Sequence, residues 1–126
     1  MHGLSMRRDE LGVEGERLAE RFLRKRGYRI LARNFRCPRG EIDLVARDGA
    51  TVVFVEVKGK RTGKFGSPLE AVTARKRRRL ALVANYYLTA FKLHHLRTRF
   101  DVVGIRWVTG GEPSIVLVKD AFRTSN

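Results

Sequence analysis

The chain has 126 residues, enough for one domain with a modest core, and its 27 Lys and Arg against 13 Asp and Glu give a formal charge of +14. No apolar run approaches the roughly 20 residues that span a bilayer, the first residues form no hydrophobic signal segment, and the lone Cys37 excludes an internal disulfide. These features predict a soluble cytoplasmic protein whose charge needs a polyanionic partner. Nucleic acid is the commonest such partner and an anionic membrane surface is the other; we expect nucleic acid and no membrane.

Apolar spacing and turn residues divide the chain into a helix, a strand, a β-hairpin, a second helix and two more strands. Gly27 is expected to end the first helix. The second helix has three agreeing start signals, because Ser67 can cap it, Pro68 suits its first position and Glu70 completes a capping box. The expected elements are helices at 9–26 and 67–89 and strands at 28–33, 41–47, 51–58, 100–107 and 114–119.

The order of these elements predicts an α/β fold with a mixed central sheet flanked by helices. No internal repeat or long linker divides the sequence. We therefore expect residues 1–126 to form a single domain, with 1–8 as a flexible basic tail.

The hairpin places charged residues on strands that are otherwise apolar. An Asp-Gly pair at 48–49 predicts a two-residue turn, which sets Asp43 opposite Phe54. Glu56 is then diagonal to Asp43, about 7–8 Å away at the backbone. Side-chain alternation puts Glu56 and Lys58 on the same face as Asp43. A slip of one residue would instead bury Asp43 among valines, which argues for this register.

Two carboxylates at that spacing can bind one divalent cation, Mg²⁺ or Mn²⁺. A cation held by Asp43 and Glu56 would neutralise a phosphodiester and lower the pKa of bound water, and Lys58 would hold the water or stabilise developing charge. The alternative is that Glu56 and Lys58 form a cross-strand ion pair on a solvated face, which contributes about 1 kcal/mol at most.

Glu16 interrupts an apolar stripe of the first helix that also carries Ala19 and Leu23. A charge in that place is either turned outward at the edge of the stripe or held inward by a partner such as a metal or Lys58. The sequence leaves both alternatives open.

The second helix contains five consecutive basic residues, so some of them must point toward its buried side. Lys76 lies four residues from both Val72 and Leu80, on that side. Its ammonium either extends past the core to solvent or reaches the scissile phosphate. The predicted nucleic-acid contacts are Lys60, Arg61 and Lys64 in the loop and Arg75, Lys76, Arg77, Arg78 and Arg79 in the helix.

Short motifs run in order along nearly the whole chain, from about Gly12 to Phe122. They are Gly15-Glu16 with Ala19 and Phe22-Leu23, Gly27-Tyr28, Arg33-Asn34-Phe35-Arg36, Gly40-Glu41-Ile42-Asp43-Leu44, Phe54-Val55-Glu56-Val57-Lys58, Phe65-Gly66, Glu70-Ala71-Val72, Lys76, Arg79-Leu80, Arg99-Phe100-Asp101-Val102 and Ala121-Phe122. This set resembles the YraN family of small bacterial proteins, which belongs to the restriction-endonuclease-like, PD-(D/E)XK nuclease superfamily.

The resemblance implies an αβββαβ core with Asp43, Glu56 and Lys58 at the metal and catalytic positions of the superfamily. It also implies that Glu16 sits where related archaeal Holliday-junction resolvases carry a helix-borne acidic residue. Ile42, rather than the proline of the superfamily motif, precedes Asp43.

These observations lead to the expectation of a metal-dependent endonuclease that acts on DNA, including branched or damaged DNA. Asp43 and Glu56 would bind Mg²⁺ or Mn²⁺ with the Val57 carbonyl as third ligand, Lys58 would manage the water, and Glu16 would orient Lys58 or join the metal shell. A homodimer would suit a cut in two strands. The rival expectations are a non-catalytic nucleic-acid-binding protein and a scaffold for an acidic protein partner.

Overall fold

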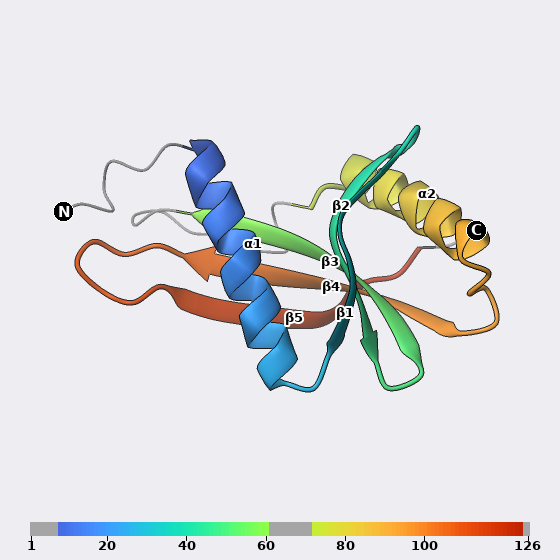
Figure 1. The fold of residues 1–126 in the computed structure, drawn as a ribbon. Coiled ribbons are helices and arrows are strands. Elements are labelled where there is room, and N and C mark those ends of the chain that lie inside the picture. Colours follow the sequence, from blue (N-terminus) through green and yellow to red (C-terminus); the bar gives the residue numbers. More distant parts are fainter. Residues whose placement is uncertain (1–7, 61–71, 125–126) are drawn as a thin grey trace.

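The chain folds into a five-stranded mixed sheet with two helices, in the element order that the sequence predicts (Figure 1). The computed structural model describes residues 8–60 and 72–124. The elements are α1 Arg8–Lys25, β1 Arg29–Cys37, β2 Gly40–Asp48, β3 Thr51–Lys60, α2 Ala74–Ala90, β4 Arg97–Arg106 and β5 Ser114–Phe122. Within these ranges, no helix is both long enough and apolar enough to cross a membrane. The expected tail at 1–8 lies outside the described residues except for Arg8, which opens α1.

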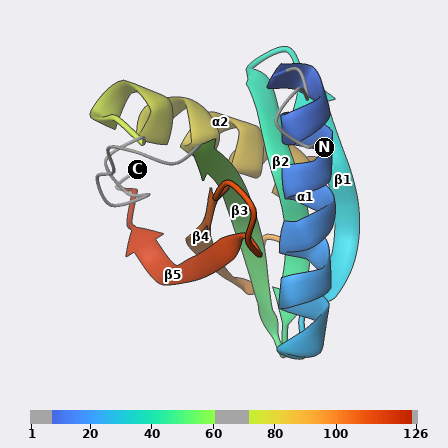
Figure 2. The same cartoon turned by 90° about the vertical axis from the view of Figure 1, so that its left-hand side faces the viewer.

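The strands lie in the sheet in chain order, β1-β2-β3-β4-β5. Every neighbouring pair is antiparallel except β3 and β4, which are parallel and are joined across one face of the sheet through α2. Because side chains alternate along each strand, the sheet has two apolar faces, one covered by α1 and the other by α2 (Figures 1 and 2). Phe54 and Val102 pack toward α2, whereas Val53 and Val103 pack toward α1.

The end of α1 follows the prediction closely. Gly27 has a φ of +91°, and its N–H donates to the carbonyl of Arg24. The N–H of Tyr28 donates to the carbonyl of Leu23 at 3.1 Å. These two bonds form a Schellman motif, in which glycine adopts the left-handed conformation at little steric cost.

The start of α2 differs from the prediction. The helix begins at Ala74, and the side chain of Thr73 accepts a hydrogen bond from the Lys76 N–H. Val72 and Thr73 are not helical, so a helix unbroken from Ser67 is wrong. The predicted capping residues Ser67, Pro68 and Glu70 lie outside the described residues. Val72 and Leu80, predicted to lie on the buried side of this helix, are buried, as are Val83, Ala84 and Tyr87.

The register of the β2–β3 hairpin also differs from the prediction. Asp48 pairs with Thr51, so the turn residues are Gly49 and Ala50, and Val45 rather than Asp43 lies opposite Phe54. Gly49 alone of the two turn residues has a positive φ, +61°, as in a type II′ turn with glycine in its first central position. The correction shifts the pairing by two residues. An even shift preserves the faces, so the predicted common face of the site residues survives.

The β1–β2 hairpin extends beyond the sheet and forms a fork with β3. Pairing between β2 and β3 ends at Leu44 and Val55, whereas β1 and β2 stay paired as far as Cys37 and Gly40. Figure 1 shows this end of the hairpin separating from β3 and approaching α2. The fork is where the candidate site residues lie.

A buried polar network holds the opposite end of the sheet together. The Tyr28 hydroxyl donates to Asp101 at 2.9 Å and accepts a hydrogen bond from Arg99 at 2.8 Å. Arg99 also bonds to Asp48, and the buried carboxylate of Asp101 accepts the N–H of Asp120. Residues from the α1–β1 connection, the β2–β3 hairpin, β4 and β5 therefore share one set of hydrogen bonds.

Replacing Tyr28 with Phe should lower the free energy of unfolding by about 1–3 kcal/mol, because it removes the hydroxyl that bonds to the buried Asp101 carboxylate and to Arg99. Urea denaturation monitored by circular dichroism measures this change. The control is Tyr86→Phe, at a tyrosine that is 46% exposed. Equal effects of the two substitutions would contradict a role for the network in stability.

Candidate functional site

Asp43, Glu56, Lys58 and Lys76 converge on the α2 side of the fork, and Glu16 approaches them from α1. We call these five residues the carboxylate site. Asp43 is on β2, Glu56 and Lys58 are on β3, and Lys76 is in the first turn of α2. The fork separates β2 from β3 at this level, so side chains from both helices can reach the same gap in the sheet.

The Asp43 carboxylate takes the place of a backbone partner at the fork. Its Oδ2 atom accepts a hydrogen bond from the Val57 N–H at 2.7 Å. Val57 lies just past the last recorded pair between β2 and β3. A backbone N–H in a largely buried position requires an acceptor. The contact satisfies that requirement and fixes the carboxylate beside Glu56.

Glu56 is buried and bound by two lysines, so the interpretation of a solvated ion pair is wrong. Only 6% of the residue is exposed. Its Oε2 atom lies 3.3 Å from the Lys58 ammonium and 2.5 Å from that of Lys76. The Lys76 ammonium is paired with Glu56 inside the site rather than extended to solvent, and its reach to a phosphate stays a prediction.

Asp43 carries the largest pKa shift of the site. Burial raises its pKa, and repulsion from Glu56 and then Glu16 adds to this effect, against the opposing hydrogen bond from Val57; the resulting value is about 7. A hydrogen bond between the Asp43 and Glu56 carboxyl groups acts in the same direction. The two carboxyl groups are therefore close neighbours in the site.

Glu16 is half-buried on α1 and lies near other acidic residues. Burial raises its pKa, as do the charges of Glu41 and Glu56, while hydrogen bonding to the Asn34 side chain lowers it. The expected role of Glu16 in a metal shell or beside Lys58 stays a prediction. Its hydrogen-bonding neighbour is Asn34 of β1, which the sequence did not indicate as a site residue.

The two lysines respond differently to the same surroundings. Burial and then the neighbouring Lys76 lower the pKa of Lys58, although Glu56 opposes them. Burial also acts to lower the pKa of Lys76, but its closer contact with Glu56 outweighs this effect and raises it. Lys58 is therefore the lysine that gives up its proton more readily.

An open cavity of about 560 Å³ surrounds these groups. Its basic lining includes Arg36 from β1 and Arg79 from α2, and the stem of Arg79 lies against Gly40 in the hairpin. A Cβ atom at Gly40 would lie 3.0 Å from the Arg79 Cδ atom, so glycine permits this close approach. Arg36 pairs with Glu41 at 3.3 Å. Neither Arg36 nor Glu41 was predicted as a site residue.

The carboxyl oxygens fit a divalent cation. A cation between Asp43 and Glu56 would remove the repulsion between them, and the ion pairs of Glu56 with Lys58 and Lys76 both use Oε2. Proteins usually bind Mg²⁺ with one or two carboxylates, water and substrate phosphate. Among the residues that the structure describes, no three His, Cys, Asp or Glu side chains form a metal-binding group. The candidate donors are two carboxylates with the carbonyl of Val57, a residue that also lines the cavity.

The predicted nucleic-acid contacts fall into different environments. Lys60, Arg75, Arg78 and Arg79 are exposed. Arg77 is half-buried, where its Nε donates to the Val72 carbonyl and its guanidinium lies over the Phe122 ring. Arg61 and Lys64 lie outside the described residues. Arg77 therefore makes contacts within the fold, whereas Lys60, Arg75, Arg78 and Arg79 are exposed to solvent.

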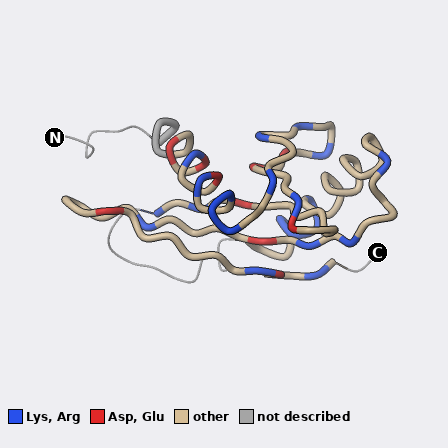
Figure 3. The backbone as a smooth tube through the Cα atoms, turned by 60° about the horizontal axis from the view of Figure 1, so that its bottom comes forward, with Lys and Arg blue, Asp and Glu red and all other residues tan. Residues whose placement is uncertain are grey.

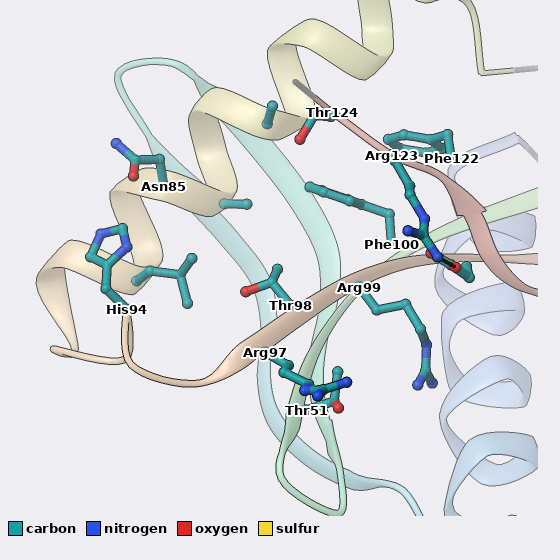
Figure 4. A pocket seen from close by; sticks show the side chains of 14 residues that line it. Thr51, Asn85, His94, Arg97, Thr98, Arg99, Phe100, Phe122, Arg123 and Thr124 are labelled. Atoms are coloured by element: carbon teal, nitrogen blue, oxygen red, sulfur yellow. Dashed lines mark hydrogen bonds and ion pairs between the residues drawn. The ribbon is translucent and has the colours of Figure 1, made fainter. Parts of the chain in front are cut away.

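A larger cavity of about 690 Å³ lies on the other side of α2 and contains none of the carboxylate-site residues (Figure 4). Phe100 and Phe122 line it together with polar residues such as Arg97 and Thr51. His94, at its edge, lies in the turn after α2 and interacts with the side chain of Thr89 in the last turn of that helix. His94 and the adjacent His95 are both exposed in a surface turn.

Replacing Asp43 with Asn should stabilise the metal-free protein at high pH. The unfolded chain releases the Asp43 proton near 3.8, but the folded protein holds it until about 7. Between these values the folded state binds more protons, so this group lowers stability as pH rises. The neutral amide can still accept the Val57 N–H.

We expect Asp43→Asn to gain about 2 kcal/mol over wild type at about pH 8 in EDTA, and little at about pH 4.5. Urea denaturation at both pH values measures the difference. An equal gain at both values would show that ionisation of Asp43 is not responsible.

Comparison with known proteins shows the family of the chain. Residues 15–105 match the family described as "Uncharacterised protein family UPF0102". The UPF0102 protein of Caldicellulosiruptor saccharolyticus is 48% identical over 118 residues, which cover 93% of this chain and 100% of the relative. The UPF0102 protein of Desulfosudis oleivorans is 44% identical, and the alignment covers 91% of each chain. That of Rhodococcus jostii is 48% identical over 89% of this chain and 95% of its own. The chain belongs to the UPF0102 family, the YraN family that its motifs resemble.

Proposed function

We propose that this protein is a metal-dependent endonuclease that hydrolyses phosphodiester bonds in DNA. The observation that carries the proposal is the convergence of Asp43 and Glu56 with Lys58 and Lys76 inside an open cavity with further basic residues in its lining. Acidic residues gathered within a strongly basic protein suit a site that binds a cation next to a polyanion. The resemblance to PD-(D/E)XK nucleases supports DNA, including branched or damaged DNA, as the substrate.

Asp43 and Glu56 would hold Mg²⁺ or Mn²⁺, with the Val57 carbonyl as the third protein ligand. The cation, when bound, supplies charge neutralisation at the phosphate and lowers the pKa of water. The Val57 N–H keeps Asp43 in place from the opposite side. Glu16 adds negative charge behind the two ligands and strengthens their attraction for a cation.

The two lysines would have separate tasks. Lys58, with its lowered pKa, can hold the attacking water and accept its proton. Lys76 keeps its proton and can move from Glu56 to a phosphate oxygen once a cation neutralises that carboxylate. Arg36 and Arg79 lie at the same cavity and can contact neighbouring phosphates.

The charge of the described chain suits a long polyanion. Figure 3 shows lysine and arginine along both helices and several strands, with far fewer acidic residues. Arg75 and Arg78 of α2 are exposed near the start of the helix that carries Lys76. They are proposed to contact the phosphate backbone without reading sequence. A homodimer, which would suit a cut in two strands, is part of the proposal and can be tested by light scattering.

A non-catalytic nucleic-acid-binding protein is the second candidate. The observation that favours it is the pairing of Glu56 with both lysines, since the two ammonium groups neutralise the carboxylate without a metal ion. The two candidates differ in what Mn²⁺ does. An endonuclease binds it saturably through Asp43, whereas a simple binder has no such site.

Incubation with Mn²⁺ and linear, flapped and four-way DNA should give cleavage of at least one substrate. Glu56→Gln preserves the shape of the side chain but removes its charge. It should reduce the rate of cleavage by more than about a hundredfold, as expected for the loss of several kcal/mol of transition-state stabilisation. Gel analysis of end-labelled DNA measures the cleavage rates of the wild type and of the variant. Cleavage by the variant at the wild-type rate would exclude this site as its origin.

Replacing Arg75 and Arg78 together with Ala should weaken DNA binding in low salt. The slope of log affinity against log salt should fall by about 1 for each phosphate contact removed. Fluorescence anisotropy with labelled duplex DNA in EDTA measures the slope without cleavage.

The matched control replaces Arg29 and Arg97, which are also exposed but lie at the opposite end of the sheet from the carboxylate site. Equal losses in the two double variants would argue for diffuse attraction rather than contact through α2.

A further inference from the structure

Asn34 adopts a backbone conformation that strands rarely contain. Its φ is +49°, in the left-handed region, although it lies inside β1 and not in a turn. Asparagine tolerates this region better than most residues, yet the conformation is costly without support from its surroundings. Backbone strain of this kind often marks a functional site, which directs attention to the neighbours of Asn34.

In both β1 and β2, the side chains switch from one face of the sheet to the other at the level of Asn34 and Asp43. Arg33 pairs with Leu44 on one side of this level and Phe35 pairs with Ile42 on the other, with no recorded pair between them. Leu44 belongs to the core under α1, whereas Ile42 belongs to the core under α2. Regular alternation would place both on one face, so the chain twists at Asp43.

The same twist occurs in β1 across Asn34. Arg33 reaches the α1 side, where it bonds to Glu20, whereas Phe35 packs edge-on against Tyr87 of α2 at 5.0 Å. The left-handed residue in β1 therefore accompanies the departure of Asp43 from the ladder. That departure lets the Asp43 carboxylate reach the Val57 N–H.

Asn34 lies next to the point where Arg33 of β1 is bonded to α1. Arg33 binds Glu20 through two nitrogens, at 2.7 and 2.6 Å. Glu16 lies one helical turn before Glu20, on the same side of α1. The adjacent residues Arg33 and Asn34 thus lie beside two glutamates one turn apart on the same helix, and Asn34 is close enough to Glu16 to lower the pKa of its carboxyl group.

We propose that Asn34 is a positioning residue of the carboxylate site. Its left-handed backbone frees Asp43 from the β1–β2 ladder, and its side-chain amide holds Glu16 toward Asp43 and Glu56. The ligand that benefits is a divalent cation, so this part of the inference rests on the proposed function. The contact between Asn34 and Glu16 does not depend on the proposed function.

The key variant is Asn34→Gly, which keeps the left-handed backbone accessible and removes only the amide. Calorimetric titration of the full chain with Mn²⁺ should show about tenfold weaker binding, typical for the loss of a group that orients metal ligands. The melting temperature without metal should stay within a few degrees of wild type. Asn34→Val, which opposes the left-handed backbone, should lower both the affinity for Mn²⁺ and the melting temperature.

Lys92→Gly is the matched control. Lys92 has a φ of +56° in the turn after α2, so the substitution eases a similar backbone without touching the site. Its affinity for Mn²⁺ should equal that of wild type. A loss as large as that of Asn34→Gly would overturn the inference, as would wild-type affinity in Asn34→Gly.

A double-mutant cycle with Glu16→Ala separates this inference from the proposed function. In metal-free urea denaturation, the effects of Asn34→Gly and Glu16→Ala should add to more than that of the double variant, because each removes the same contact. Additive effects would overturn the inference. Failure of wild type to bind Mn²⁺ would instead remove the proposed function, while the metal-free cycle would still decide whether Asn34 holds Glu16.

Discussion

The end of pairing between β2 and β3 is the constraint on which the carboxylate site depends. A continuous ladder past Leu44 and Val55 would leave no room between the strands and would satisfy their backbone groups without side chains. The fork removes that backbone partner, and a carboxylate replaces it at the Val57 N–H. Polar side chains can therefore occupy a gap in a sheet whose two faces are otherwise apolar.

Charge balance in this gap is close but incomplete. Glu56 has two ammonium partners, whereas Asp43 has a backbone donor and acidic neighbours. Buried charges are tolerated when paired, and an unpaired one tends to take up a proton. Proteins commonly accept such a loss of stability at sites that bind or react. The imbalance supports a role in binding a cation better than a purely structural role for the site.

Much of the fold could be read from the sequence, because apolar alternation and turn residues fix the element order and the faces of the strands. The register of the β2–β3 hairpin could not, since an Asp-Gly pair fits a type I′ turn as readily as glycine fits the first position of type II′. The alternatives for Glu16 and Lys76 depended on tertiary contacts. Asn34 could not be predicted as a site residue, because a single left-handed residue inside a strand leaves no periodic signal in the sequence.

The hydrogen bond from Val57 to Asp43 makes one amide proton an internal reporter on the chemistry of the gap. On its other edge β3 stays paired with β4 as far as Lys60 and Arg106, so the strand itself is held firmly. The environment of the Val57 amide then varies mainly with the carboxylate that accepts it. Its NMR resonance and its rate of hydrogen exchange are sensitive to protonation or ion capture at Asp43, even when no substrate is present.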